Sequence, residues 1–463
     1  MDEIIYLSAT NMARMIRQRE VSSVELVDAH LKRIEEVNPK LNAVVQVDGE
    51  RALAAARRAD EALARGEGRT ALHGVPMTIK DSLDTADMIT TGGTKGRSSF
   101  VPERDATVVA RLRSAGAILL GKTNTPELTL AGETDNLIYG QTNNPYDLSR
   151  SPGGSSGGAA AIIATGGSPL DLGSDTGGSI RSPAHYCGIA GIKPTSGRVP
   201  RTGHIVPFGM GALDSLTQIG PLARYVEDLA LILPLLVGVD WLDPGIIPMP
   251  LSDPDAIALK GLRVAVYTDN GIIAPTPETA ATVHEVAKGL EAAGMVVEEA
   301  LPPALVMTND LYYGISKADG QAWVRRLLQK AGTTEMSPVI GKRLEESEAI
   351  DTPRFTFLLE ELDRFRSEML SFMKNYDLIL CPADAFPALP HGAPQRDDRY
   401  GDFSHTSAYN LTGWPGAVVR AGTSPEGLPI GVQVVAGAWR EDVVLAVARS
   451  IESLYGGWKQ PPL

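Results

Sequence analysis

Apolar and polar residues alternate along this chain in blocks that predict helices near its start. Between residues 9 and 66 the spacing predicts two helices. One begins after a candidate N-cap at Ser22 or Ser23 and is expected to end at Asn38–Pro39, and the other is an alanine-rich run over 52–64. Both helices are expected to lie on the outside of the molecule.

Short apolar runs predict buried strands farther along. Val75–Ile79 and Ala117–Leu120 are such runs, and the pattern between them predicts a helix over Ala106–Ala115. This strand–helix–strand order is typical of an α/β fold, in which helices cover a sheet. A stretch rich in Pro and Asp, Asp243–Asp255, is either a linker or a long surface loop. Further strands are predicted at 263–267, 296–298, 378–381 and 431–435, and further helices over 279–293 and 442–454.

Composition places this chain among globular proteins. It has 463 residues, of which 43% are hydrophobic and 21% charged, and that apolar share excludes a largely disordered chain. At ~150 residues per domain the length predicts about three domains, although large α/β domains exceed that size. The 43 Lys and Arg against 56 Asp and Glu give a net charge of −13. Because like charges repel, neither nucleic acid nor an anionic membrane is expected as the main partner.

The sequence carries no sign of secretion, membrane insertion or metal binding. Its N-terminus lacks a basic segment followed by an apolar stretch, so no secretory signal is predicted. The longest apolar run, Leu229–Val239, falls short of the ~20 residues that span a bilayer. The two cysteines, Cys187 and Cys381, are too far apart for a disulfide framework or a metal-ligand spacing. We therefore expect a cytoplasmic protein with no membrane span, no metal and no cofactor.

Glycines and charged residues are distributed unevenly along the chain. Sixteen of the 47 glycines lie between Gly153 and Gly220, and only four residues from 151 to 196 are charged. Low charge together with many glycines predicts a buried segment in which backbones approach closely. Such a segment either packs tightly and does nothing else, or holds a site built from main-chain groups.

Two clusters in this segment suggest acyl-transfer chemistry. The first is Gly153–Gly158, which an apolar helix follows, and the second is Gly173–Arg181. In the second cluster the glycines let the chain turn tightly. Four backbone N–H groups are therefore expected to converge as an oxyanion hole requires, those of Thr176, Gly177, Gly178 and Ser179. Ser179 beside such a hole is a candidate nucleophile, and a serine nucleophile needs a base.

Lys80 is the preferred candidate for that base. It follows the apolar run Val75–Ile79, so its side chain is expected to point into a region of low dielectric. Desolvation there lowers the pKa of an ammonium group from ~10.4 toward neutrality. The structural alternative is an ion pair with Asp81 or Asp84. Histidine is the usual base, but His185 has no spaced carboxylate partner. The remaining candidates are weaker still: His204, His391 and His405.

Two short patterns match known motifs without fitting their mechanisms. Residues 116–123 match the phosphate-loop pattern GxxxxGK(S/T), but the four middle residues, Ala-Ile-Leu-Leu, predict a buried strand rather than a loop. Residues 153–157 match the GxSxG motif of α/β-hydrolases, but the stretch 144–152 before them is polar and turn-like where that motif needs an apolar strand. Neither a nucleotide-binding protein nor an α/β-hydrolase is favoured.

Longer motifs between Gly74 and Pro221 resemble the amidase signature family of serine hydrolases. The segments that carry this resemblance are Gly74–Asp81, Gly121–Asn124, Ser151–Gly158, Gly173–Arg181 and Cys187–Thr195. Weaker similarity reaches both ends of the chain. The resemblance therefore implies one α/β/α domain over 1–463, with a large twisted mixed β-sheet covered by helices. Within that domain, 1–70 would form outer helices and 74–221 the core that carries the motifs.

The resemblance also implies a catalytic triad of the Ser–cis-Ser–Lys type. Ser179 would be the nucleophile, Ser155 the bridging serine and Lys80 the base, and no cofactor is implied. Three further residues are expected to support the site, or else merely to cap a helix and form a buried ion pair: Ser156, Asp175 and Arg181.

Members of the family act on different amides, so the substrate is a separate question. We expect hydrolysis of the C–N bond of a small apolar or aryl carboxamide, with carbamates and esters as further substrates, by a monomer or homodimer. The alternative is the glutaminase subunit of a transfer-RNA amidotransferase, which supplies ammonia from glutamine. Glutamine-handling members carry an acidic residue where Phe403 stands here, with Asp402 as its neighbour. Residues 125–136 resemble amidases of hydrophobic amides, which adds candidates for the pocket that are otherwise core residues: Thr129, Leu130 and Gly132.

Overall fold

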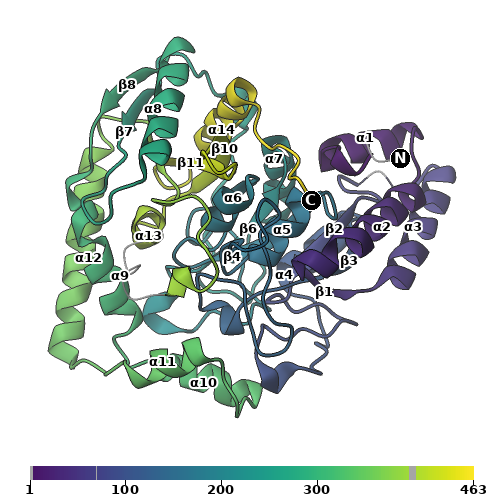
Figure 1. Ribbon diagram of the computed structural model, residues 1–463, viewed down its shortest axis with the longest axis horizontal. Coiled ribbons are helices and arrows are strands. Elements are labelled where there is room, and N and C mark those ends of the chain that lie inside the picture. The colour runs from purple at the N-terminus through teal and green to yellow at the C-terminus, as the bar shows by residue number, and fades with distance from the viewer. Residues whose placement is uncertain (1–3, 69, 396–402) are drawn as a thin grey trace.

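Two β-sheets form the centre of this protein (Figure 1). The computed structural model describes residues 4–68, 70–395 and 403–463. Within these ranges the larger sheet has eight strands, in spatial order β4 (Leu170–Asp175), β6 (Gln218–Ala223), β5 (Ala190–Lys193), β10 (Gly416–Thr423), β11 (Pro429–Ala436), β9 (Leu378–Pro382), β7 (Arg263–Val266) and β8 (Val296–Glu299). The smaller sheet orders β1 (Val44–Val47), β3 (Ile118–Thr123) and β2 (Pro76–Lys80). The larger sheet is mixed, because β7 is parallel to both of its neighbours and the other pairs are antiparallel.

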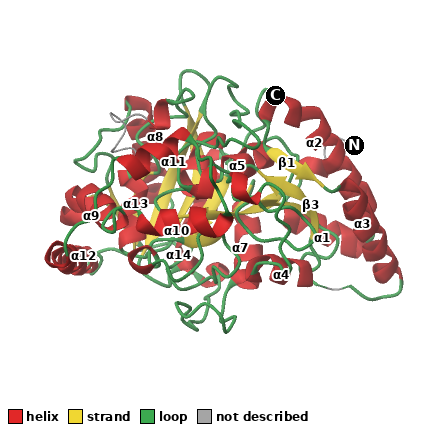
Figure 2. Cartoon of the chain, turned by 90° about the horizontal axis from the view of Figure 1, so that it is seen from below, coloured by secondary structure: helices red, strands yellow, loops and turns green. Residues whose placement is uncertain are grey.

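Helices surround the sheets (Figure 2). The α-helices are α1 (Ala9–Gln18), α2 (Ser23–Leu41), α3 (Gly49–Ala64), α4 (Thr107–Ser114), α5 (Gly157–Ala164), α6 (Arg181–Cys187), α7 (Val226–Leu236), α8 (Pro277–Ala292), α9 (Thr308–Ser316), α10 (Ala322–Ala331), α11 (Pro338–Glu345), α12 (Thr352–Phe372), α13 (Ser404–Leu411) and α14 (Glu441–Tyr455). Short 3₁₀ helices lie at Ile4–Tyr6, Lys95–Arg97, Glu127–Thr129, Gly211–Leu213, Pro254–Ala256, Pro303–Met307 and Ala393–Gln395. Across the described part of the chain, no helix is both long and apolar enough to cross a membrane.

Strand β10 shows how the two faces of the larger sheet are covered. Ala417 and Val419 pack in one apolar cluster with residues of α7, α8 and α14, whereas Val418 packs in another cluster with residues of α5 and α6. Successive side chains of a strand point to opposite faces, so these helices lie on the two sides of the sheet. The expected α/β architecture, a large mixed sheet between helices, is confirmed.

The N-terminal region differs from the prediction of two helices. The structure has three helices there, α1, α2 and α3, and the strand β1 between the last two. Ser22 caps α2 as expected, in a reciprocal capping box with Glu25. The helix does not end at Pro39, however, but continues to Leu41. Proline in the last turn removes only one intrahelical hydrogen bond, and Asn42 ends the helix in a left-handed conformation with φ of 51°.

The predicted strands that follow are largely confirmed. The apolar run at 75–79 is β2, and the runs at 263–267, 296–298, 378–381 and 431–435 are β7, β8, β9 and β11. The phosphate-loop match at 116–123 falls on β3, and its Lys122 is buried, donating to the carbonyl of Leu83 over 2.6 Å. A nucleotide-binding loop is therefore absent at these described residues.

Candidate active site

Lys80 is the last residue of β2 and its amine is surrounded by hydroxyl groups. Its Nζ atom lies 2.7 Å from Ser155 Oγ, 2.9 Å from Ser156 Oγ and 3.0 Å from Ser174 Oγ. Burial lowers the pKa of Lys80 from 10.5 to about 7, although the carboxylates of Asp171 and Asp175 oppose that shift. With that pKa, about half of the protein molecules have a neutral Lys80 amine at pH 7, and a neutral amine can accept a proton.

The alternative, an ion pair of Lys80 with a carboxylate next to it in the sequence, is wrong. Asp81 accepts hydrogen bonds from Thr91 and lies 3.9 Å from Lys122. Asp84 accepts a hydrogen bond from Arg97 over 2.6 Å. Both carboxylates therefore interact with other groups, and the amine of Lys80 stays among the serines.

Asp171, on β4, is a residue whose importance the sequence did not reveal. Its carboxylate accepts hydrogen bonds from Thr78 Oγ1 over 2.6 Å, from the Lys80 backbone N–H over 2.9 Å and from Thr123 Oγ1 over 3.0 Å. These bonds join β4 of the larger sheet to β2 and β3 of the smaller one. Asp171 thereby fixes the backbone from which the Lys80 side chain extends.

Ser155 and Ser156 lie in the turn that leads into α5. The peptide bond between Gly154 and Ser155 is cis. A Cβ atom on Gly154 would lie 2.7 Å from the carbonyl oxygen of Ala131, so the close approach of two backbones requires glycine there. Ser156 precedes α5 but its side chain makes no capping hydrogen bond. The capping alternative for Ser156 is therefore wrong, since its hydroxyl faces Lys80 instead.

Ser179 lies where β4 turns toward α6, in the segment with many glycines. From 151 to 195 every residue is buried except Thr176 and Ser179. The preceding Gly178 has φ of 151°, and a Cβ atom there would collide with Thr406 Oγ1. The segment is thus closely packed as expected, and it opens at the residues expected to hold the nucleophile and the oxyanion hole.

Asp175 and Arg181 form a buried ion pair on either side of Ser179. Arg181 Nη2 lies 2.8 Å from Asp175 Oδ1, and its Nε lies 3.0 Å from Oδ2. Asp175 Oδ2 also accepts the backbone N–H of Ile180 over 3.1 Å. Burial alone raises the pKa of Asp175, but the charge and hydrogen bonds of Arg181 outweigh it and lower the value to about 2. Asp175 and Arg181 thus join the two ends of the turn that carries Ser179.

A pocket of about 160 Å³ opens at Ser179. The four residues expected to line a substrate pocket, Thr129, Leu130, Gly132 and Phe403, all contribute to its wall. The sequence did not point to Leu213 or to the part of the wall from 308–345, which includes Tyr312, Tyr313, Ser316, Trp323 and Arg343. None of the described lining residues is acidic. Asp402, the neighbour of Phe403, lies outside the described residues.

Arg343 gives this pocket its one cationic side chain among the described lining residues. Its Nε donates to Gln321 Oε1 over 2.8 Å, and its Nη1 donates to the Leu130 carbonyl over 3.4 Å. The remaining N–H groups of a guanidinium have a fixed planar geometry that suits a carboxylate.

The histidines do not take the place of Lys80. His185 is buried, and its ring nitrogens lie 2.8 Å from the Gly431 backbone nitrogen and 2.9 Å from the Phe386 carbonyl oxygen. Burial lowers its pKa below the ordinary range. These contacts hold the ring within the core, as the packing alternative expects. Among the described residues no group of His, Cys, Asp and Glu side chains is arranged to hold a metal ion.

Comparisons with known proteins identify relatives over the full length of the chain. The family described as Amidase matches residues 25–445. The A subunit of the glutamyl-tRNA(Gln) amidotransferase of Carboxydothermus hydrogenoformans is 36% identical to this chain, over 97% of each. The solved structure of 6-aminohexanoate cyclic dimer hydrolase, complexed with substrate, has a TM-score of 0.87 and 29% identity, covering 99% of both chains. The structure of the corresponding amidotransferase chain from Thermotoga maritima has a TM-score of 0.80 and 26% identity, covering 99% of this chain and 98% of its own.

These relatives correct one expectation. Hydrolysis of an apolar or aryl carboxamide by a free-standing enzyme is the wrong main interpretation, because the relatives at 33–36% identity over nearly the whole chain are named as the A subunit of an amidotransferase. The expectation of an apolar substrate that was drawn from Phe403 rested on a single position of the pocket wall. The structure adds Arg343 to the same pocket, and a cation there suits a charged substrate better than an apolar one.

Proposed function

The chain belongs to the amidase family, and on that premise we propose that it cleaves the side-chain carboxamide of glutamine as the glutaminase subunit of an amidotransferase. The observation that carries this proposal is the 36% identity to the A subunit of such an enzyme, over 97% of both chains. The geometry around Lys80 supports cleavage of a carboxamide, and the charge of Arg343 supports a substrate that carries a carboxylate.

The proposed reaction begins with a neutral Lys80. Its amine accepts the proton of Ser155 over the 2.7 Å that separates them, while Ser155 Oγ accepts the proton of Ser179. Ser179 Oγ then forms a bond to the carboxamide carbon, and the carbonyl oxygen becomes an oxyanion. Backbone N–H groups from Thr176 to Ser179 stabilise that charge, and such stabilisation is commonly the largest single contribution to acyl transfer.

The second half of the reaction releases ammonia and then glutamate. When the C–N bond breaks, the leaving nitrogen takes the proton that Lys80 received, so that ammonia departs and Ser179 carries a γ-glutamyl ester. Water then attacks this ester, with the same lysine accepting a proton through Ser155. Ser179 regains its proton as glutamate leaves.

Arg343 is the group we propose for recognition of the substrate. Glutamine carries an α-carboxylate at the end opposite its carboxamide, and a guanidinium binds a carboxylate with two parallel hydrogen bonds. Arg343 and Ser179 line the same pocket of about 160 Å³. That volume is below the roughly 300–1,000 Å³ of pockets for drug-sized ligands, as a small amino acid requires.

The partners in this proposal are other subunits. The glutaminase subunit of an amidotransferase passes its ammonia to a separate active site, and the net charge of −13 argues that another chain holds the transfer RNA. A cytoplasmic location belongs to the same proposal. A monomer or homodimer is then expected only for the chain in isolation.

The test measures ammonia released from glutamine by the purified chain, alone and together with the subunits that copurify with it. We expect release in at least the assembled form, a γ-glutamyl adduct on Ser179 in the mass spectrum of the quenched reaction, and neither in Ser179→Ala. Absence of ammonia release in both preparations would refute the proposal.

A matched pair of variants tests the role of Arg343. Arg343→Gln is expected to raise KM for glutamine about tenfold or more with a smaller effect on kcat, because a hydrogen bond to a charged group contributes ~1.5–3 kcal/mol. Lys342→Gln removes the same charge one residue away on α11, where Lys342 is outside the pocket and pairs with Glu346. An equal rise in KM in both variants would contradict this role.

A further inference from the structure

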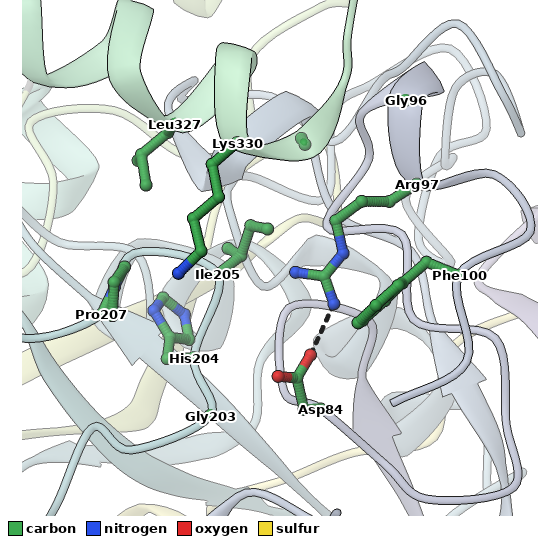
Figure 3. A pocket seen from close by; sticks show the side chains of 11 residues that line it. Asp84, Gly96, Arg97, Phe100, Gly203, His204, Ile205, Pro207, Leu327 and Lys330 are labelled. Carbon is green, nitrogen blue, oxygen red and sulfur yellow. Dashed lines mark hydrogen bonds and ion pairs between the residues drawn. The ribbon is translucent and has the colours of Figure 1, made fainter. Parts of the chain in front are cut away.

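A second pocket lies apart from the residues assigned to acyl transfer (Figure 3). Its volume is about 340 Å³, and three segments form its wall: the loop after β2, the residues 203–207, and the C-terminal end of α10. The α10 end is fixed against the loop, because a Cβ atom on Gly96 would collide with the Ala331 carbonyl oxygen. The Thr94 and Thr333 hydroxyls also hydrogen-bond over 2.6 Å. The cavity is thus bounded by contacts within the chain.

Two cationic side chains point into this pocket. Figure 3 shows the Lys330 ammonium extending from α10 toward the ring of His204, and Arg97 on the opposite wall. Arg97 stacks on Phe100 at 4.2 Å and donates from Nη2 to Asp84 over 2.6 Å. Its Nε is buried and has no hydrogen-bond partner among the described residues. Two cations against one carboxylate leave this pocket positive in a chain whose net charge is −13.

His204 adds a buried polar group without a partner. The residue is 4% exposed, and its Nε2 atom makes no hydrogen bond to any described residue. Its Nδ1 lies 3.1 Å from the Val206 amide nitrogen and 3.0 Å from the Val206 carbonyl oxygen. In the tautomer that accepts the amide, Nε2 carries the proton and is a donor without an acceptor among the described residues. A buried polar atom without a partner is costly, so a ligand that accepts this hydrogen bond would be stabilised.

We propose that this pocket binds a small oxyanion, a phosphate or carboxylate group, between Lys330, Arg97 and the Nε2–H of His204. All three groups are donors in that state, and two of them are charged, which is the arrangement that recognises anionic oxygens. Asp84 would remain on Arg97 and orient it rather than contact the anion. The site does not depend on which carboxamide Ser179 attacks.

The test titrates inorganic phosphate and, separately, acetate into the full chain by calorimetry at constant ionic strength. At least one of the two is expected to bind with a dissociation constant in the millimolar range or below. Lys330→Gln is expected to raise that constant about tenfold or more, as loss of a charged hydrogen bond does. Lys330 is exposed on α10, so the substitution leaves the core unchanged.

Two control variants test whether cations outside this pocket account for the binding of the anion. Arg326→Gln removes a charge from the same helix, where Arg326 is 60% exposed and pairs with Asp319 outside the pocket. Arg343→Gln removes the cation of the acyl pocket. Both are expected to leave unchanged the dissociation constant of the binding that Lys330→Gln weakens. The proposal is overturned if neither anion binds, if Lys330→Gln binds as tightly as the unchanged chain, or if Arg343→Gln abolishes binding.

Discussion

Replacing Lys80 by methionine tests the condition that the proposed chemistry requires, an uncharged amine in the folded chain. The pKa of Lys80 falls from 10.5 to about 7 on burial. The unfolded chain therefore binds more protons than the folded chain between these values. Because the folded-state pKa is lowered, the folded chain is fully stable with respect to this group above pH 10.5 and loses stability as pH falls toward 7.

The magnitude follows from the two pKa values of Lys80. At pH 7 the difference in protonation costs the folded chain about 4 kcal/mol, and at pH 10 it costs about 1 kcal/mol. The Lys80→Met variant has no titratable side chain at position 80. The quantity to compare is the free energy of unfolding of the variant minus that of the unchanged chain. This difference is expected to be about 3 kcal/mol larger at pH 7 than at pH 10.

Urea denaturation of both proteins at a series of pH values between 7 and 10 measures this difference. The hydroxyls of Ser155, Ser156 and Ser174 lose a partner in the variant, but that loss does not change with pH over this range and cancels from the comparison. Lys374→Met is the control, because Lys374 is exposed and its ammonium stays in water in both states. A difference for Lys80→Met that stays constant from pH 7 to pH 10 would refute a neutral amine.

Three further predictions concern the same site. The kcat/KM for glutamine is expected to rise with pH through about 7, the pKa of Lys80, and a profile that is flat there would contradict Lys80 as the base. Ser155→Ala is expected to lower kcat by ~10²–10⁴-fold in steady-state assays, since it removes the hydroxyl 2.7 Å from the amine; a nearly unchanged kcat would exclude proton transfer through Ser155. Asp175→Asn is expected to lower the free energy of unfolding by ~3–5 kcal/mol, because it leaves the Arg181 charge buried without its partner, and urea denaturation that shows no loss would contradict this.

The sequence predicts strands where apolar residues dominate a run, and it does not reveal β4, in which apolar and polar residues alternate. β9 is apolar throughout, and β2 and β7 are mostly apolar, so these strands are predicted. β4 reads Leu-Asp-Leu-Gly-Ser-Asp and was missed, although all six of its residues are buried. Its Asp171 is tolerated in the core because Thr78, Thr123 and a backbone N–H satisfy it. Those partners come from distant strands, so no local pattern could reveal them.

The same distinction separates the parts of the candidate site. Lys80 is a candidate because the apolar run before it is local, and Ser179 because the glycines around it are local, whereas Ser155 is implied by the resemblance to the amidase signature family. Ser174 was missed as a neighbour of the amine, although it lies within one of the two clusters, because its contact with Lys80 joins residues on different sheets. Local sequence thus identified which side chains are unusual, and only the packing of the two sheets determines which of them meet.

The substrate is the part of the function that depends most on this packing. Phe403 and Arg343 are 60 positions apart in the sequence, yet they line one pocket with Ser179. An aromatic ring considered alone favours an apolar acyl group, whereas a pocket that also contains a guanidinium permits a substrate with an apolar chain and an anionic end. Glutamine has both features. The proposal that glutamine is the substrate therefore rests on the whole lining of the pocket, to which α11 contributes the cation of Arg343.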